Sequence, residues 1–174
     1  IKKEEFKMLD PDSNPAYKFC DAKFWTAWEG KKCLGRIGAI INHDYNKKIG
    51  KEMGRISRME FVDDKNVTDI LFETAENWLI EKQVKAIHGP LGFTNFDNQG
   101  LLIEGFDYLP SIASVMHLPY YQDHFEQAGY EKEFLDELRF VYVQPIPYIQ
   151  RFITDPSGEN IGLEDILAEK LDAM

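Results

Sequence analysis

The side chains best suited to nucleophilic, acid–base or metal chemistry are spread along the chain. They are four histidines and two cysteines: His43, His88, His117, His124, Cys20 and Cys33. None of them follows the spacing of a zinc site or of a Cys-x-x-Cys redox pair. We therefore expect no bound metal, and we expect both thiols to be free in a reducing compartment.

A second polar group lies at residues 95–100, where amides and one carboxylate alternate with other residues. Long loops in compact domains often contact substrate, so one interpretation is a lid over a binding site. Asx turns explain the same residues structurally, and both interpretations stay open. Asp97, Glu104 and Asp107 lack the spacing of an EF-hand, which argues against calcium.

Strands in the first third of the chain follow from alternating apolar residues. The segments 22–28 and 33–41 flank a short turn around Gly30 and predict a β-hairpin. A third strand is expected at 54–62. The turn-rich stretch 6–19 and the polar stretch 43–50 are expected to be loops, along with a long connection at 91–118.

Helical periodicity is clearest at residues 66–82, with Asn66 as the expected N-cap. A short helix is expected at 120–127, because Pro119 suits its first turn and Gly129 its end. The remaining expected elements are strands at 84–88 and 138–143 and a terminal helix at 163–173. This order predicts a mixed sheet with helices packed against it, an α+β or α/β fold.

The composition excludes several classes of protein. A chain of 174 residues with 44% apolar residues can form a domain with a substantial core. Its 20 Lys and Arg against 30 Asp and Glu give a net charge of −10, which argues against binding nucleic acid or anionic membrane. No apolar run is long enough to span a membrane. The start at Ile1 suggests a fragment of a longer chain, and we expect a cytoplasmic protein.

The order hairpin, strand, helix, strand, long loop, helix, strand resembles the GNAT superfamily of acyl-CoA N-acyltransferases. The similarity covers roughly residues 20–144, and its best local matches are 75–79 and 119–130. Three further segments resemble a little-characterised bacterial branch of GNAT-like proteins: 35–37, 89–93 and 100–107. The resemblance implies a GNAT-like, mostly antiparallel central sheet flanked by helices. We expect this domain to cover 1–144, followed by a C-terminal tail at 145–174.

The resemblance also implies a coenzyme site. In this family the pyrophosphate of coenzyme A binds at the turn before the central helix, on backbone N–H groups. That turn corresponds to residues 63–68. Asp63 stands where the family has Gln or Arg, and Asp64 follows it. Two carboxylates beside a pyrophosphate are repulsive, by roughly 1 kcal/mol for charges 4 Å apart in water. The coenzyme contacts implied are Phe61, Val62, Lys65, Asn66, Val67 and Thr68.

An acid and a base are implied as well. Many relatives reprotonate the leaving thiolate with a tyrosine; here that position is Phe125, and Tyr121, one helical turn earlier, is the expected substitute. Glu60 and His88 are the candidates for the base that takes a proton from the amine. The simpler interpretations are that Glu60 faces solvent, that His88 bonds the backbone at a strand end, and that Tyr121 packs as an aromatic.

Two functions remain open at this point. The first is an N-acyltransferase that moves an acetyl or longer acyl group from acyl-CoA to a small primary amine. The second is a non-catalytic GNAT-like module that binds a small ligand or a protein partner. Acidity suits a cationic amine, but it identifies no particular substrate. The oligomeric state is left open.

Overall fold

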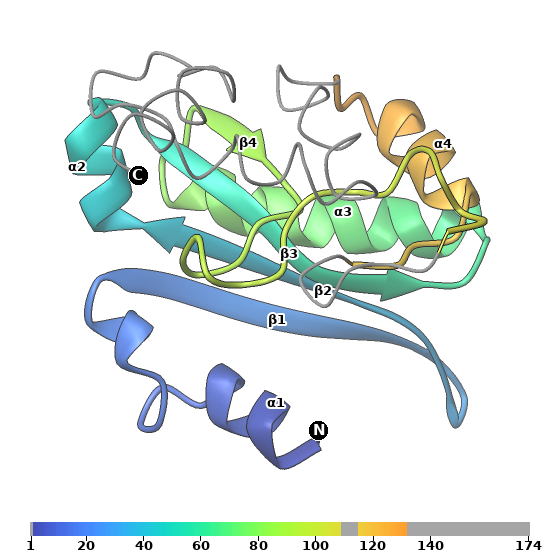
Figure 1. Cartoon of the computed structure of the whole chain (residues 1–174), viewed down its shortest axis with the longest axis horizontal. Coiled ribbons are helices and arrows are strands. Elements are labelled where there is room, and N and C mark those ends of the chain that lie inside the picture. The colour runs from blue at the N-terminus through green and yellow to red at the C-terminus, as the bar shows by residue number, and fades with distance from the viewer. Residues whose placement is uncertain (1, 109–114, 132–174) are drawn as a thin grey trace, which may run out of the picture. The chain divides into compact units, whose positions relative to one another are not determined.

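The computed structural model describes residues 2–108 and 115–131 (Figure 1). These residues belong to two units, 1–100 and 101–174, and each unit is described by itself. The strand expected at 138–143 and the helix expected at 163–173 lie outside the described residues. The expected boundary between a domain at 1–144 and a tail at 145–174 stays a prediction.

The first unit is built on a four-stranded mixed sheet in the order β1-β2-β3-β4. β1 (Cys20–Glu29), β2 (Lys32–Asn42) and β3 (Met53–Phe61) are antiparallel, and β4 (Ala86–His88) runs parallel to β3. The expected hairpin and third strand are confirmed. Gly30 has φ +56° in the hairpin turn, a conformation that glycine adopts without steric cost.

One face of the sheet is covered by α3 (Lys65–Glu81), drawn in green in Figure 1. Its apolar stripe includes Leu71 and Leu79, both buried. The helix approaches closely at two glycines: a Cβ on Gly35 would lie 2.8 Å from Leu71 Cδ1, and one on Gly54 would lie 2.8 Å from Leu79 Cδ2.

The other face is covered by α1 (Lys2–Leu9), the 3-10 helix η1 (Pro15–Lys18) and the loop after β4. Consecutive strand residues point to opposite faces. Accordingly Gly35 contacts α3, whereas the next residue, Arg36, bonds Glu5 of α1. A small core on this face joins η1, β1, β2 and the loop: Ala16, Cys20, Ile40 and Phe93.

Three local expectations are wrong. Helix α1 occupies part of the stretch expected to be a loop at 6–19, and its Glu5 is tied to the sheet by ion pairs. The polar stretch 43–50 contains α2 (His43–Ile49), which is capped by the Asn42 side chain and ends at Gly50 with φ +65°. The N-cap of α3 is Asp64 rather than Asn66, because the Asp64 side chain accepts the backbone N–H of Asn66.

The second unit contains α4 (Tyr120–Gln127), which confirms the helix expected there. Pro119 lies at its N-cap, and Gly129 follows its C-terminus with φ +84°. Tyr121, His124 and Phe125 are buried. Among the helices in the described ranges, none is long and apolar enough to cross a membrane.

The packing of α3 gives a first prediction. Leu79 is 0% exposed, so Leu79→Ala should lower the free energy of unfolding by about 2–5 kcal/mol through lost burial and the cavity left behind. Ile80, which is 62% exposed on the same helix, is the matched control. Ile80→Ala should change the free energy of unfolding by less than about 0.5 kcal/mol. Urea unfolding measures both. Equal losses would contradict the packing described for α3.

Candidate functional site

The central strand β3 carries a bulge. Its register with β2 shifts between Arg36 and Gly38, so that Ser57 pairs with Gly38 and Glu60 with Arg36. Within this bulge Arg58 has φ +45°, in the left-handed region that residues with side chains rarely adopt. Bulges re-aim side chains and interrupt the hydrogen-bond ladder, and such local strain persists only where surrounding contacts hold it.

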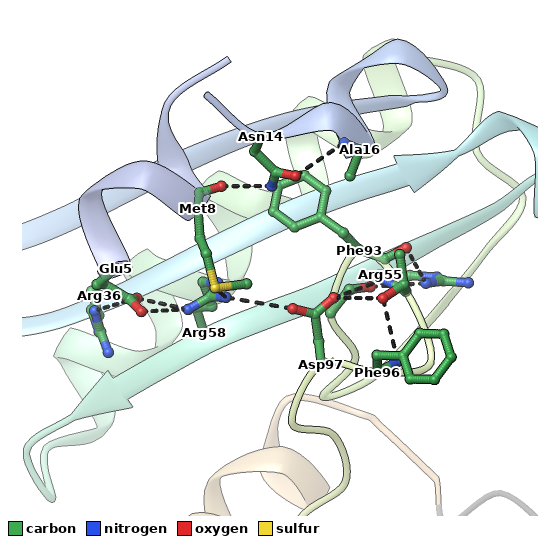
Figure 2. A network of polar contacts seen from close by, with 12 residues as sticks. Glu5, Met8, Asn14, Ala16, Arg36, Arg55, Arg58, Phe93, Phe96 and Asp97 are labelled. Carbon is green, nitrogen blue, oxygen red and sulfur yellow. Dashed lines mark hydrogen bonds and ion pairs between the residues drawn. The ribbon is translucent and has the colours of Figure 1, made fainter. Parts of the chain in front are cut away.

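The side chain of Arg58 supplies those contacts, as Figure 2 shows. Its Nη1 lies 2.7 Å from both carboxylate oxygens of Glu5 on α1. Its Nη2 lies 3.7 Å from Asp97 Oδ1 and 3.5 Å from Met8 Sδ. The Arg58 side chain is 18% exposed and that of Asp97 10%. One guanidinium therefore joins the bulge to α1 and to the loop after β4.

Glu60, a candidate base, lies on the same network but in an exposed position. Its carboxylate is 2.9 Å from Arg36 Nη2, and its side chain is 69% exposed. Arg36 also reaches Glu5, at 3.3 Å. Glu60 therefore faces solvent, as its simpler interpretation expects, and its carboxylate is paired with the guanidinium of Arg36 on the neighbouring strand.

His88, the other candidate base, ends β4 and lies opposite Arg55 in the parallel register. Its Nε2 is buried and has no hydrogen-bond partner among the described residues. Burial, with a smaller contribution from the charge of Arg55, lowers the pKa of His88 to about 4. The ring is therefore neutral at pH 7 and lies 6.1 Å from the ring of Tyr45. A neutral imidazole with an unused nitrogen can accept a proton.

The two candidate bases are not brought together. His88 is opposite Arg55, and Glu60 lies five residues further along β3. At about 3.3 Å per residue, the two positions are roughly 16 Å apart along the strand. Tyr121 belongs to the second unit, where its ring stacks on Tyr120 at 5.0 Å and lies 5.1 Å from His117. The packing role considered for Tyr121 is thus present; the proton-donor role stays a prediction.

The turn expected to hold a pyrophosphate is largely engaged in its own contacts. Asp64 Oδ1 accepts both the backbone N–H of Asn66, at 2.9 Å, and its side-chain amide. Lys65 Nζ is paired with Asp69, one helical turn further on. Thr68 is buried, and its hydroxyl donates to the Lys65 carbonyl. The carboxylate of Asp64 therefore sits where an anionic ligand would approach the first turn of α3.

The other residues implied as coenzyme contacts make packing and backbone contacts within the first unit. Phe61 is buried and makes an edge contact with Phe72, at 6.3 Å between ring centroids. Val62 donates its N–H to the Leu34 carbonyl, and Val67 is buried on the inner side of α3. The coenzyme role of these residues stays a prediction.

The loop after β4 runs from Pro90 to Gly100, and we call it the 90–100 loop. Its ends are joined by a 2.7 Å bond from the Gly100 N–H to the Pro90 carbonyl. Buried Arg55 donates to the carbonyls of Gly92 and Phe93, at 2.8 and 3.1 Å. The Phe93 ring fills the core between Tyr17 and Phe24. Both interpretations of its polar residues stay open, because an Asx-type turn is present and the loop also reaches the bulge.

Arg55, Arg58 and Glu5 were not identified from the sequence. Two arginines three residues apart in a strand whose other residues are mostly apolar were the available signal, because a buried guanidinium requires partners. Their partners could not have been inferred, since Glu5 is 53 residues from Arg58. Asp97 was identified only as a member of a polar stretch.

The thiols and the described part of the second unit add no further centre. Both cysteines are free, and burial raises the pKa of the Cys20 thiol to about 11, so it is unreactive at neutral pH. His117 accepts the Leu102 N–H on Nδ1 at 3.3 Å, and burial lowers its pKa to about 4. Within 2–108 and 115–131, no three His, Cys, Asp or Glu residues are grouped so as to hold a metal ion.

These observations define a mixed α/β domain whose central strand is bulged and clamped by charged groups. No family model matches the chain, and no solved structure matches it. It is similar to two curated proteins. Protein YghO of Escherichia coli (strain K12) is 37% identical over 115 residues, which are 64% of this chain and 30% of that protein.

The second similar protein is the bacterial ceramide synthase of Caulobacter vibrioides (strain NA1000 / CB15N). It is 30% identical over 131 residues, which are 74% of this chain and 34% of that protein. The chain thus spans about a third of the length of the curated relatives it matches.

Proposed function

We propose that this chain is the acyl-transfer domain of an N-acyltransferase with a GNAT-like sheet, which moves an acyl group from acyl-CoA to a primary amine. The observation that carries the proposal is the bulge of β3 beside the short parallel strand β4. β4 pairs only with Met53–Arg55, so in the described residues it ends before the bulge begins. A backbone N–H that has left the ladder can donate to a thioester carbonyl and stabilise the charge that develops there.

The similarity to a bacterial ceramide synthase supports a particular class of substrate. A ceramide is the amide of a fatty acid and a long-chain amino alcohol, so its formation joins an acyl group to an amine. We therefore propose a long-chain primary amine as acceptor and a fatty acyl thioester as donor. The net charge of −10 favours the approach of a cationic amine.

The chemistry requires two proton transfers. The amine nitrogen attacks the thioester carbonyl carbon, a C–N bond forms, and the C–S bond breaks. His88 takes the proton released by the nitrogen, and the leaving thiolate takes a proton from water. His88 suits the base role better than Glu60, because its neutral Nε2 is unused, whereas Glu60 is paired with Arg36.

One observation favours the alternative, a non-catalytic module that binds a small ligand or a protein partner. The first turn of α3 does not fit a pyrophosphate well, because the Asp64 carboxylate caps it and Lys65 is paired with Asp69. If the chain is an enzyme, the pyrophosphate of the donor must lie away from this turn or displace the cap.

Calorimetric titration of acetyl-CoA and palmitoyl-CoA into the purified protein separates the two functions. The transferase proposal predicts saturable binding of at least one of them. The transferase proposal would be contradicted by the absence of heat at millimolar acetyl-CoA together with no binding of palmitoyl-CoA below its micellar concentration.

Charge reversal at the turn gives a second prediction. Asp63→Arg replaces a like charge by an opposite one near the expected pyrophosphate, and should tighten acyl-CoA binding by about 10-fold. Glu73→Arg, on an exposed position two turns along α3, is the matched control and should change affinity by less than about 2-fold. Equal gains in both variants would mean that only the net charge of the protein matters.

A further inference from the structure

Phe96 is the most exposed large apolar side chain of the described residues, at 95%. Most aromatic side chains on a protein surface are partly covered by neighbouring groups, because complete burial of a Phe side chain stabilises the folded state by about 1.5–3 kcal/mol. The position of Phe96 in the 90–100 loop makes this exposure informative, because the loop is held at several points.

Hydrogen bonds between the residues on either side of Phe96 close the turn that carries it. Asp97 Oδ2 accepts the backbone N–H of Thr94 at 2.8 Å and its hydroxyl at 3.2 Å, and the Asp97 N–H returns to the Thr94 carbonyl. The Phe96 N–H donates to Thr94 Oγ1. The two arms of the loop pack so closely that a Cβ on Gly92 would lie 2.1 Å from Asp97 Cβ. Figure 2 shows the Phe96 ring beside this network.

The same turn is bonded to the bulge of the central strand. Asp97, the residue after Phe96, forms the 3.7 Å ion pair with Arg58. Consecutive Cα atoms are about 3.8 Å apart, so Phe96 is one residue removed from a group that contacts the bulge. The proposed reaction places the thioester carbonyl at that bulge. A long aliphatic chain attached to either reactant is long enough to extend from the bulge past Phe96.

We propose that the 90–100 loop is a preformed wall of the substrate site and that Phe96 contacts the aliphatic chain of the substrate. This inference rests on the proposed function and adds a subsite to it. Because the backbone of the turn is already ordered, the ring can bind a chain without the entropic cost of ordering a loop, which suits recognition of a long, featureless hydrocarbon. The chain can belong to the acyl donor or to the amine, and the two are distinguished by varying one at a time.

The test measures amide formation by wild type, Phe96→Ala and Phe96→Leu. One arm compares acetyl-CoA with palmitoyl-CoA at a fixed amine, and the other compares ethanolamine with sphinganine at a fixed donor. We expect Phe96→Ala to lower kcat/KM by about 10-fold for the long-chain member of one arm and by less than about 2-fold for its short-chain member. Phe96→Leu should recover most of the loss. Phe6→Ala, which removes another exposed aromatic ring (71%), should leave both arms unchanged.

Three outcomes would overturn the inference while leaving the proposed function intact. They are equal losses for short and long chains, no loss for either, and a loss that Phe6→Ala reproduces. Loss of binding to phosphatidylcholine vesicles by Phe96→Ala, without a dependence on substrate chain length, would assign the ring to a bilayer and also overturn it. Absence of amide formation by the wild type with every pair would instead contradict the proposed function.

Discussion

Replacing Arg58 by alanine is expected to lower kcat by about 10- to 100-fold and to reduce the free energy of unfolding by about 2 kcal/mol. The stability loss arises because Glu5 loses its closest cation in a part-buried setting, while the cost of φ +45° is the same for alanine as for arginine. The loss of kcat follows because the bulge is released from both α1 and Asp97, and a displacement of about 1 Å can cost about 100-fold in rate.

Further variants separate the backbone from the side chain. Arg58→Gly removes the clamp but accepts the left-handed conformation, so it should be more stable than Arg58→Ala by about 1 kcal/mol yet equally slow. Glu5→Gln should also lower kcat, since it weakens the same clamp from α1. Lys82→Gln breaks an exposed ion pair with Asp21, and it is the matched control that should retain wild-type kcat. Wild-type kcat in Arg58→Gly would show that the clamp does not position the bulge.

His88→Gln is expected to lower kcat by about 100- to 10,000-fold with little change in acyl-CoA affinity, because it removes the proposed base and leaves the donor contacts. Since the folded pKa of His88 is about 4, the acid limb of the kcat profile should lie near pH 4 rather than near 6.5. His43→Gln, an exposed substitution, is the control for kcat. Wild-type kcat in His88→Gln would exclude His88 as the base.

The same histidine should make the protein less stable in acid. Above pH 6.5 His88 is neutral in both states, and its burial carries no protonation cost. Between pH 6.5 and about 4 the unfolded state binds a proton that the folded state does not, so stability falls as pH falls, by about 1–3 kcal/mol. His117 has the same direction of shift in the second unit. Denaturant unfolding at several pH values should show a smaller decline in His88→Gln, and an unchanged decline would contradict the burial of its imidazole.

Local patterns predicted most elements correctly because those elements depend on neighbours in the sequence. Alternation and a glycine turn located the hairpin of β1 and β2, and the 3.6-residue period located α3. α2 was missed although Asn42 and Gly50 carry ordinary cap signals, because the polar composition of 43–50 was given more weight. The start of α3 was expected two residues too late, at Asn66, because Asp64 and Asn66 are both residue types that cap helices.

The site was predicted less well because its contacts join distant parts of the chain. His88 and Glu60 were identified by residue type, but only strand register shows that they lie well apart along β3. Arg58 was missed because its left-handed backbone and its partners have no local signature. The fold of residues 22–88 was therefore more predictable than the chemistry it supports.

The sequence by itself determined a mixed sheet with helices, an acidic chain, and a turn before α3 that carries two carboxylates. The tertiary structure decided what those features do. It made Glu60 an exposed partner of Arg36 and Arg58 the link between the bulge, α1 and the 90–100 loop, whereas the helix cap formed by Asp64 is a local contact. The physical reason is that caps and strands are set by groups a few residues apart, whereas the pairing of buried charges depends on which distant segments the folded chain brings within about 4 Å.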